Sequence, residues 1–427
     1  MRNTALALAV TLAVSSSFGS AHAATPAQHH TSTRQAGARA ATLQEQLAQR
    51  DRQIAALQAA VADLQAKVSD LQHHDTAQTG INATQADVNT STQQQVTSLQ
   101  ASARKTDKLE KLVDDTSVSG RMFIDLSDVS QQVNGTRTAA SGYGLDIKRG
   151  YLTISHRFDD IWSATLTSDF NYVANDGQTQ LFIKNLYVQG KFSDAFVFRA
   201  GEIPMTWTPY VEGFYGYRYV ENTLTDRAKV ANTADWGLSA NGSLGGGRVD
   251  YAAALVNGAG FKNPTRSSGM DFEGRLAFSP APGLGIAVGG YSGTLSKDTA
   301  TTSAMHTATR GDVMIAWARG NNRLGAEYFT ASNWNTVLNP LRDRASGWSA
   351  WGSIGFTPKL SAFARFDRTE PSKNLAPTLR DRYFNFGLQW DARKDFKLAL
   401  AYKHDDLRDA VNEMISREFG IFGDIAF

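Results

Sequence analysis

The chain has 427 residues, a formal net charge of +2, no cysteine and a mean hydropathy of −0.33. The absence of cysteine excludes disulfide bonds and thiolate metal sites, and the small net charge gives no general attraction to nucleic acid. Beyond the N-terminus, no apolar run reaches the ~18 residues that a transmembrane helix needs. Any membrane-spanning part must therefore be a closed β-barrel.

The first residues have the pattern of a secretory signal peptide. Arg2 supplies a positive charge, residues 5–14 form a short apolar stretch, and Ala21 and Ala23 form a small-x-small cleavage site. About ten apolar residues cannot span a bilayer, so we expect cleavage after Ala23 and export of the rest of the chain.

An N-terminal arm follows the signal peptide. Residues 24–40 lack periodicity and predict a disordered leader, whereas residues 41–74 carry a heptad repeat. One set of heptad positions is mainly β-branched and the other is Leu, a pattern that predicts a coiled coil and favours two strands. An amphipathic helix packed on its own domain is the alternative. The two sets, with Arg50 as the one misfit, are Leu47, Ile54, Val61 and Val68, and Leu43, Leu57, Leu64 and Leu71.

A polar linker over residues 75–118, with a weak helical stretch at 105–113, joins this arm to the rest of the chain. The histidine pairs at 29–30 and 73–74 have no carboxylate or thiol cluster beside them. We therefore interpret them as parts of solvated polar tracts, and we expect neither a metal site nor a cofactor.

From residue 119 to residue 427, apolar and polar residues alternate, which predicts β-strands with two different faces. About sixteen segments of roughly ten residues follow one another, and short links alternate with longer polar stretches. The short links include 158–161, 192–194 and 391–395, and the longer stretches include 296–309, 333–346 and 371–379. We predict an all-β transmembrane barrel of about 16 antiparallel strands around an aqueous lumen, preceded by the coiled-coil arm.

The last strand of this barrel is predicted over residues 417–427, where Phe419, Ile421, Ile425 and Phe427 share one face. A bare terminal strand would leave an open edge, so we expect it to close the barrel against the strand that begins near Met122. An even strand number puts both ends of the barrel on the periplasmic side of the outer membrane of a Gram-negative bacterium.

Two runs of the barrel resemble the phosphate-selective porin O and P family. They are KRGYLTISHRFDDIWSATLTSDF at 148–170 and FIKNLYVQGKFSDAFVFRAGEIPMTWTPYVEGFYGYRYVEN at 182–222. The shared pattern is a basic and aromatic second strand, a Phe-Asp-Asp turn, a Trp-led third strand and an RAG-E-x-P motif. The resemblance implies a homotrimer of sixteen-stranded barrels with one long loop folded inward, and a coiled coil before the barrel is also seen in that family.

The candidate for this inward loop is residues 201–222, which are rich in aromatic side chains. Two readings remain open: its basic groups meet the solute at a constriction, or its aromatic rings fasten the loop to the barrel wall. Parity along the strands places further basic residues on the lumen face. The predicted pore-lining and solute-binding residues are Arg149, Lys191, Arg199, Arg218, Arg275, Arg365, Trp207, Tyr215 and Tyr217.

We expect a porin for passive diffusion of small hydrophilic solutes, with anions such as phosphate as candidates because arginine binds oxyanions bidentately. Acidic residues share the lumen face, so a transverse field of a general diffusion porin is equally allowed. A sugar channel with an aromatic-lined constriction and a barrel that anchors the arm, which could contact the cell wall, are alternatives. An enzyme is not expected, because His156, His306 and His404 have no nucleophile motif nearby.

Overall fold

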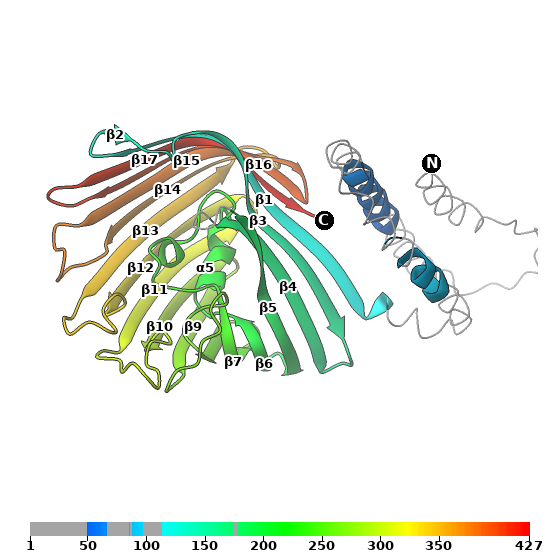
Figure 1. Ribbon diagram of the computed structural model, residues 1–427, viewed down its shortest axis with the longest axis horizontal. Coiled ribbons are helices and arrows are strands. Elements are labelled where there is room, and N and C mark those ends of the chain that lie inside the picture. The colour runs from blue at the N-terminus through cyan, green and yellow to red at the C-terminus, as the bar shows by residue number, and fades with distance from the viewer. Residues whose placement is uncertain (1–48, 66–84, 86–87, 97–112, 174–177) are drawn as a thin grey trace, which may run out of the picture. The chain divides into compact units, whose positions relative to one another are not determined.

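The computed structural model describes residues 49–65, 85, 88–96, 113–173 and 178–427 (Figure 1). The chain divides into two units, residues 1–95 and 96–427. The predicted signal peptide, the leader and both ends of the predicted coiled coil lie outside the described residues. Among the described residues, no helix is long and apolar enough to cross a membrane.

In the N-terminal unit, residues 49–65 are helical, and so are residues 88–95. Four of the predicted seam residues lie in the first helix and are half or more exposed in the single chain: Ile54, Leu57, Val61 and Leu64. Their side chains therefore form an apolar stripe on which no other described residue of this unit packs.

The second unit is a single antiparallel sheet. Its described part contains seventeen strands, of which β2 is a two-residue extension of the β1–β3 hairpin, so sixteen strands form the wall. The strands are β1 (Thr116–Val133), β2 (Thr136–Arg137), β3 (Gly142–Arg157), β4 (Trp162–Val173), β5 (Gln178–Ser193), β6 (Phe196–Pro204), β7 (Ala234–Leu244), β8 (Val249–Val256), β9 (Asp271–Ala281), β10 (Leu284–Gly293), β11 (Ala308–Arg319), β12 (Asn322–Ser332), β13 (Arg344–Gly355), β14 (Leu360–Glu370), β15 (Arg380–Arg393), β16 (Phe396–Arg408) and β17 (Glu413–Ala426).

The sheet closes on itself, because β17 pairs with both β16 and β1. The β1–β17 register runs from Arg121 opposite Ala426 to Val133 opposite Met414. Beyond the strand, Gly120 and Phe427 exchange two backbone hydrogen bonds of 2.7 and 3.0 Å. The predicted sixteen-stranded barrel and its closure by the C-terminal strand are confirmed.

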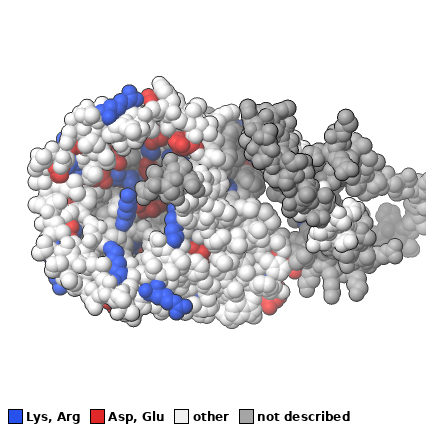
Figure 2. Space-filling model, viewed as in Figure 1, with Lys and Arg blue, Asp and Glu red and all other residues white. Residues whose placement is uncertain are grey.

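The two faces of the wall differ in chemistry. Side chains that point outward are apolar and exposed, as at Leu126, Ile315 and Phe386, whereas inward-pointing Asp125 and Asp367 are buried. Figure 2 shows that the barrel is hollowed and that charged side chains of both signs gather in the hollow. An apolar outer surface on a closed barrel is the arrangement that a lipid bilayer accepts, and it places the protein in the outer membrane.

Two β-bulges change the alternation on β3 and β5, the strands on either side of β4. In β3, Arg149 lies opposite Phe123 and Ile147 lies opposite Ile124, so Lys148 is an extra residue. In β5, Lys184 is extra in the same way between its neighbours opposite β4. A bulge lets two consecutive side chains point to one face. Lys148 and Arg149 therefore both point into the lumen.

The backbone around Gly201, in β6, leaves no room for a side chain. Its φ is 127°, and a Cβ added there would lie 2.2 Å from the carbonyl oxygen of Leu186. We expect Gly201→Ala to lower the free energy of unfolding by about 1–3 kcal/mol, because a strained φ and a backbone clash are imposed together. The urea midpoint of the refolded protein in detergent micelles measures this change.

Gly213→Ala is the matched control, because nothing lies within 4 Å of its added Cβ and the residue is helical. Alanine favours a helix, so the midpoint of this variant should stay the same or rise. Equal losses in both variants would contradict the packing described for β6.

Candidate functional site in the barrel lumen

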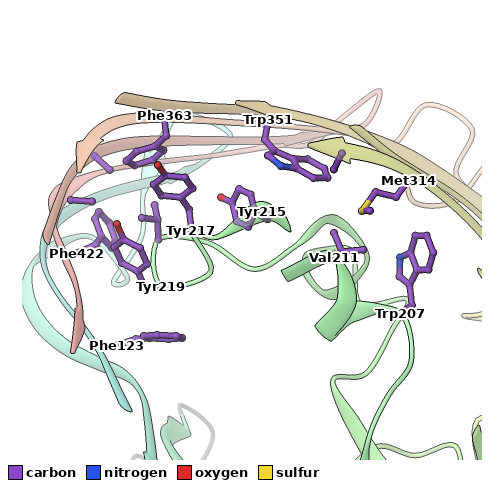
Figure 3. Packing of buried hydrophobic residues seen from close by; sticks show 14 of the residues in the cluster. Phe123, Trp207, Val211, Tyr215, Tyr217, Tyr219, Met314, Trp351, Phe363 and Phe422 are labelled. Atoms are coloured by element: carbon purple, nitrogen blue, oxygen red, sulfur yellow. The ribbon is translucent and has the colours of Figure 1, made fainter. Parts of the chain in front are cut away.

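The connection between β6 and β7, residues 205–233, is folded into the barrel (Figures 1 and 3). It contains α5 (Thr208–Tyr215) and α6 (Leu224–Arg227), and α5 has a proline in its first turn and ends at Gly216, whose φ is 77°. Proline at the start and a left-handed glycine at the end are the usual limits of a short helix. Seven apolar side chains of this loop are 0–3% exposed: Trp207, Val211, Tyr215, Tyr217, Tyr219, Val220 and Leu224.

Two carboxylates of the wall hold the beginning of the loop. The backbone N–H groups of Thr206 and Trp207 donate to Oε1 of Glu273 in β9, at 2.8 and 3.0 Å. The indole Nε1 of Trp207 donates to Oε1 of Glu327 in β12 at 2.7 Å. All four residues are buried, and leaving a buried polar group without its hydrogen bond costs more than it does in water. These contacts fix where the chain turns into the lumen.

Aromatic rings hold the middle of the loop against the wall (Figure 3). Tyr217 stacks on Phe363 of β14 with ring centroids 4.3 Å apart, and Tyr215 meets the edge of Trp351 of β13 at 5.9 Å. Tyr219 donates its hydroxyl hydrogen to Gln389 Oε1 at 2.7 Å. The polar tip of the tyrosine is thus satisfied while its ring is buried.

Arg227 holds the end of the loop. Its guanidinium lies 3.1 Å from Asp367, 2.8 Å from Asp381 and 3.4 Å from Asp405, which belong to three consecutive strands. A planar guanidinium with five N–H donors suits such a cluster of carboxylates. One side chain therefore fastens the loop to β14, β15 and β16.

A cavity of about 630 Å³ with both polar and apolar lining remains between the loop and β3. Its charged and amide lining includes Lys148, Arg149, Arg218, Glu221, Asn222 and Lys403. Lys184, the bulge residue of β5, lies near the same region, since its Nζ is 3.4 Å from the hydroxyl of Tyr151, which also accepts from Arg218 at 3.1 Å. The two bulges thus bring basic side chains towards one part of the lumen.

The members of the ion pairs in this region differ in exposure. On the β1–β4 wall the cations are partly exposed and the carboxylates are covered: 30% for Lys148 against 2% for Asp125, and 23% for Arg149 against 1% for Asp169. Around Arg227 the order is reversed at Asp405, which is 37% exposed against 10% for the arginine. Lys148 and Arg149 are therefore more accessible to water in the lumen than their own partners are, and the exposed Asp146 of β3 lines the same cavity.

Glu221, in the loop, stays ionised near neutral pH. Burial opposes its ionisation, but the ammonium groups of Lys403 and Lys148 outweigh burial and hold the pKa of this carboxyl well below its usual range. Its Oε2 lies 2.9 Å from Nζ of Lys403. A depressed pKa means that this stabilisation is complete above the ordinary carboxyl pKa and is lost only in strong acid.

The predicted site residues fall into separate places. Trp207, Tyr215 and Tyr217 are buried between the loop and the wall, and Arg365 is buried against Asp367 in the same layer.

The remaining basic residues of the prediction spread along the wall. Arg149 and Arg218 line the cavity, and Arg275 donates to the carbonyl of Thr206 at 3.0 Å. Arg199 contacts Gln189 and Asn241, whereas Lys191 pairs with Asp194 beside a short turn. The predicted residues therefore do not converge on one site.

Sequence reasoning missed Lys148, Lys184, Arg227 and Lys403. Strict alternation assigns Lys148 to the lipid face, where a charge is costly, and this conflict was the available signal for a bulge. Arg227 gave no signal, because its three carboxylate partners are more than a hundred residues away in the sequence. Among the described residues, no group of three or more His, Asp or Glu could hold a metal ion.

No protein-family model matches the chain, and no curated protein matches it. Its fold is similar to three solved structures, each aligned with 73% of this chain. The outer membrane channel DcaP of Acinetobacter baumannii is 11% identical over 97% of its length, with a TM-score of 0.53. The anion-selective porin from Comamonas acidovorans is 14% identical over 100%, and Salmonella typhi OmpF in complex with daunomycin is 10% identical over 97%, both with a TM-score of 0.51.

At these identities the likeness shows the fold, which is that of bacterial outer-membrane porins. The closer resemblance to the phosphate-selective porin O and P family stays a prediction.

The contacts of Arg227 predict the effect of removing it. Arg227→Met leaves Asp367, Asp381 and Asp405 without their shared cation, and breaking such a buried pair costs about 3–5 kcal/mol. We expect the urea midpoint to fall and the end of the loop to become accessible to protease.

Arg380→Met is the control, because this arginine pairs with Glu370 at the rim and is about one-third exposed. Its removal should change the midpoint little. A loss for Arg380→Met as large as that for Arg227→Met would contradict the role given to the buried cluster.

Proposed function

We propose that the protein is a passive channel that carries small hydrophilic solutes across the outer membrane, with a preference for anions. The observation that carries the proposal is the polar lumen, in which a loop covers apolar side chains and leaves a cavity lined by four basic and two acidic side chains. Sixteen strands enclose an aqueous channel instead of a filled core.

The preference for anions is supported by which charges face the water. Lys148 and Arg149 are partly exposed and are the more exposed members of their ion pairs, since their carboxylate partners are covered. A low-dielectric wall focuses the field of such exposed charges and raises the local concentration of counter-ions. The exposed Asp405 on the other side gives a transverse field, which separates ions without blocking neutral solutes.

Phosphate is a natural test anion, given the resemblance to the phosphate-selective family. The guanidinium groups of Arg218, Arg227 and Arg365 are, however, occupied by carboxylates of the chain itself. We therefore propose small anions as a class instead of one oxyanion. A sugar path over Trp207 and Tyr217 has less support, because these rings are covered by the wall.

We also propose that the barrels assemble as a homotrimer through the N-terminal arm. The support is the uncovered apolar stripe of Ile54, Leu57, Val61 and Leu64, which a second and a third copy of the helix would bury.

Planar-bilayer recording tests the channel directly. We expect discrete conductance steps from the purified protein and, across a KCl gradient, a reversal potential with the sign of anion preference. A purified, folded protein that gives no steps would falsify the proposed function. Cation preference would overturn the anion part and leave the channel.

The doubly substituted variant Lys148→Met/Arg149→Gln tests the source of the preference. Removing the two exposed lumen cations should lower the chloride-to-potassium permeability ratio by about twofold or more, because the focused positive field is lost. Lys191→Gln is the control, since Lys191 pairs with Asp194 beside a short turn. If Lys191→Gln lowers the ratio as much, the cavity is not the source.

Deletion of residues 43–71 tests the arm. The trimer band on gels should dissociate at a lower temperature, because the heptad seam is gone, while single-channel conductance should stay the same. A trimer of unchanged thermal stability would show that the barrels alone hold the assembly together.

A further inference from the structure

Three arginines point outward near the end of the barrel that carries the long loops. They are Arg368 in β14, Arg382 in β15 and Arg417 in β17, and all three are exposed. Each lies two residues closer to the loops than an outward-facing aromatic residue on its own strand. These aromatic residues are Phe366, Phe384 and Phe419.

Two of the arginines are direct cross-strand partners, because Arg368 lies opposite Arg382 in the β14–β15 register. Like charges in this position repel each other, so the pair is unfavourable unless an anion lies between them. Asp406 lies opposite Arg382, but its carboxylate pairs with Arg408. Within the part of the chain that the structure describes, none of the three outward arginines forms an ion pair.

Three other strands of this rim are different. On β10, β11 and β12 the corresponding outward positions are Ser292, Thr309 and Ser332, which are consecutive cross-strand partners. These positions carry hydroxyl groups and no charge. Arg344, exposed at the end of β13 and opposite Ser332, continues this row with a positive charge. The positive charge therefore gathers on β13–β17 and is absent from the three positions on β10–β12.

We propose that this sector, Arg368, Arg382 and Arg417, binds the phosphate groups of the phosphorylated lipid in the outer leaflet. The aromatic belt marks the boundary between hydrocarbon and headgroups, so a side chain two residues closer to the loops lies at headgroup level. Guanidinium groups bind phosphate oxygens bidentately, and an anion between Arg368 and Arg382 removes their repulsion. The inference depends on the membrane orientation of the barrel and not on what the channel carries.

Binding of fluorescent bisphosphorylated lipid A to the full-length protein in detergent tests this. The triple variant Arg368→Gln/Arg382→Gln/Arg417→Gln should bind it at least about tenfold more weakly. The control Arg319→Gln/Lys359→Gln/Lys394→Gln removes three charges beside the short turns at the opposite end and should bind as the parent does. Heat-modifiable gel migration and single-channel conductance, both expected to be unchanged, verify that each variant is folded.

Several outcomes would overturn the proposal. They are equal binding by the triple variant, an equal loss in the control, and equal binding of dephosphorylated lipid A. Displacement of the lipid by an equal concentration of inorganic phosphate would instead indicate a site for the free anion. Loss of the trimer in the triple variant, with lipid binding per chain unchanged, would assign the sector to contacts between copies.

Discussion

A β-sheet in lipid has no water to satisfy the N–H and C=O groups of an open edge, and this constraint governs the whole barrel. The first and last strands must find each other across the entire sheet, and they do so over thirteen register positions between β1 and β17. Closure then fixes an inside and an outside. Once the outside is apolar, the polar half of every strand is committed to the lumen.

The lumen has its own difficulty, because a ring of inward charges would be costly next to a loop rich in aromatic residues. In the loop between β6 and β7, aromatic rings contact aromatic rings of the wall, and a cation contacts carboxylates of the wall. Its rings lie on Phe363 and Trp351, and its arginine lies among carboxylates. The side chains that still face the water in the lumen are polar, and the more exposed members of the ion pairs differ in charge between the two walls. The same contacts thus hold the loop and decide which charges a solute meets.

The strands and the closure could be predicted from the sequence because both depend on a period of two that short segments reveal. The strong aromatic content of residues 201–222 also indicated a loop that is not an ordinary surface connection. The partners could not be predicted, since Arg365 was assigned to the pore by parity although it bonds to Asp367 on its own strand. The alternation of residues along a strand predicts which face a side chain occupies, but it does not predict whether a neighbouring side chain covers it.

The bulges at Lys148 and Lys184 have a consequence for assembly of the sheet. In a strand of strict alternation, a slip of two residues preserves the two faces, and only the loops oppose it. At a bulge, two consecutive polar side chains share the inner face, so no shift of β3 against β1 keeps both Lys148 and Arg149 out of lipid. A misplaced Lys or Arg costs about 2–4 kcal/mol at the middle of the membrane. The bulge therefore helps to fix the register of β3 against β1, because shifted registers would place a charged side chain in lipid.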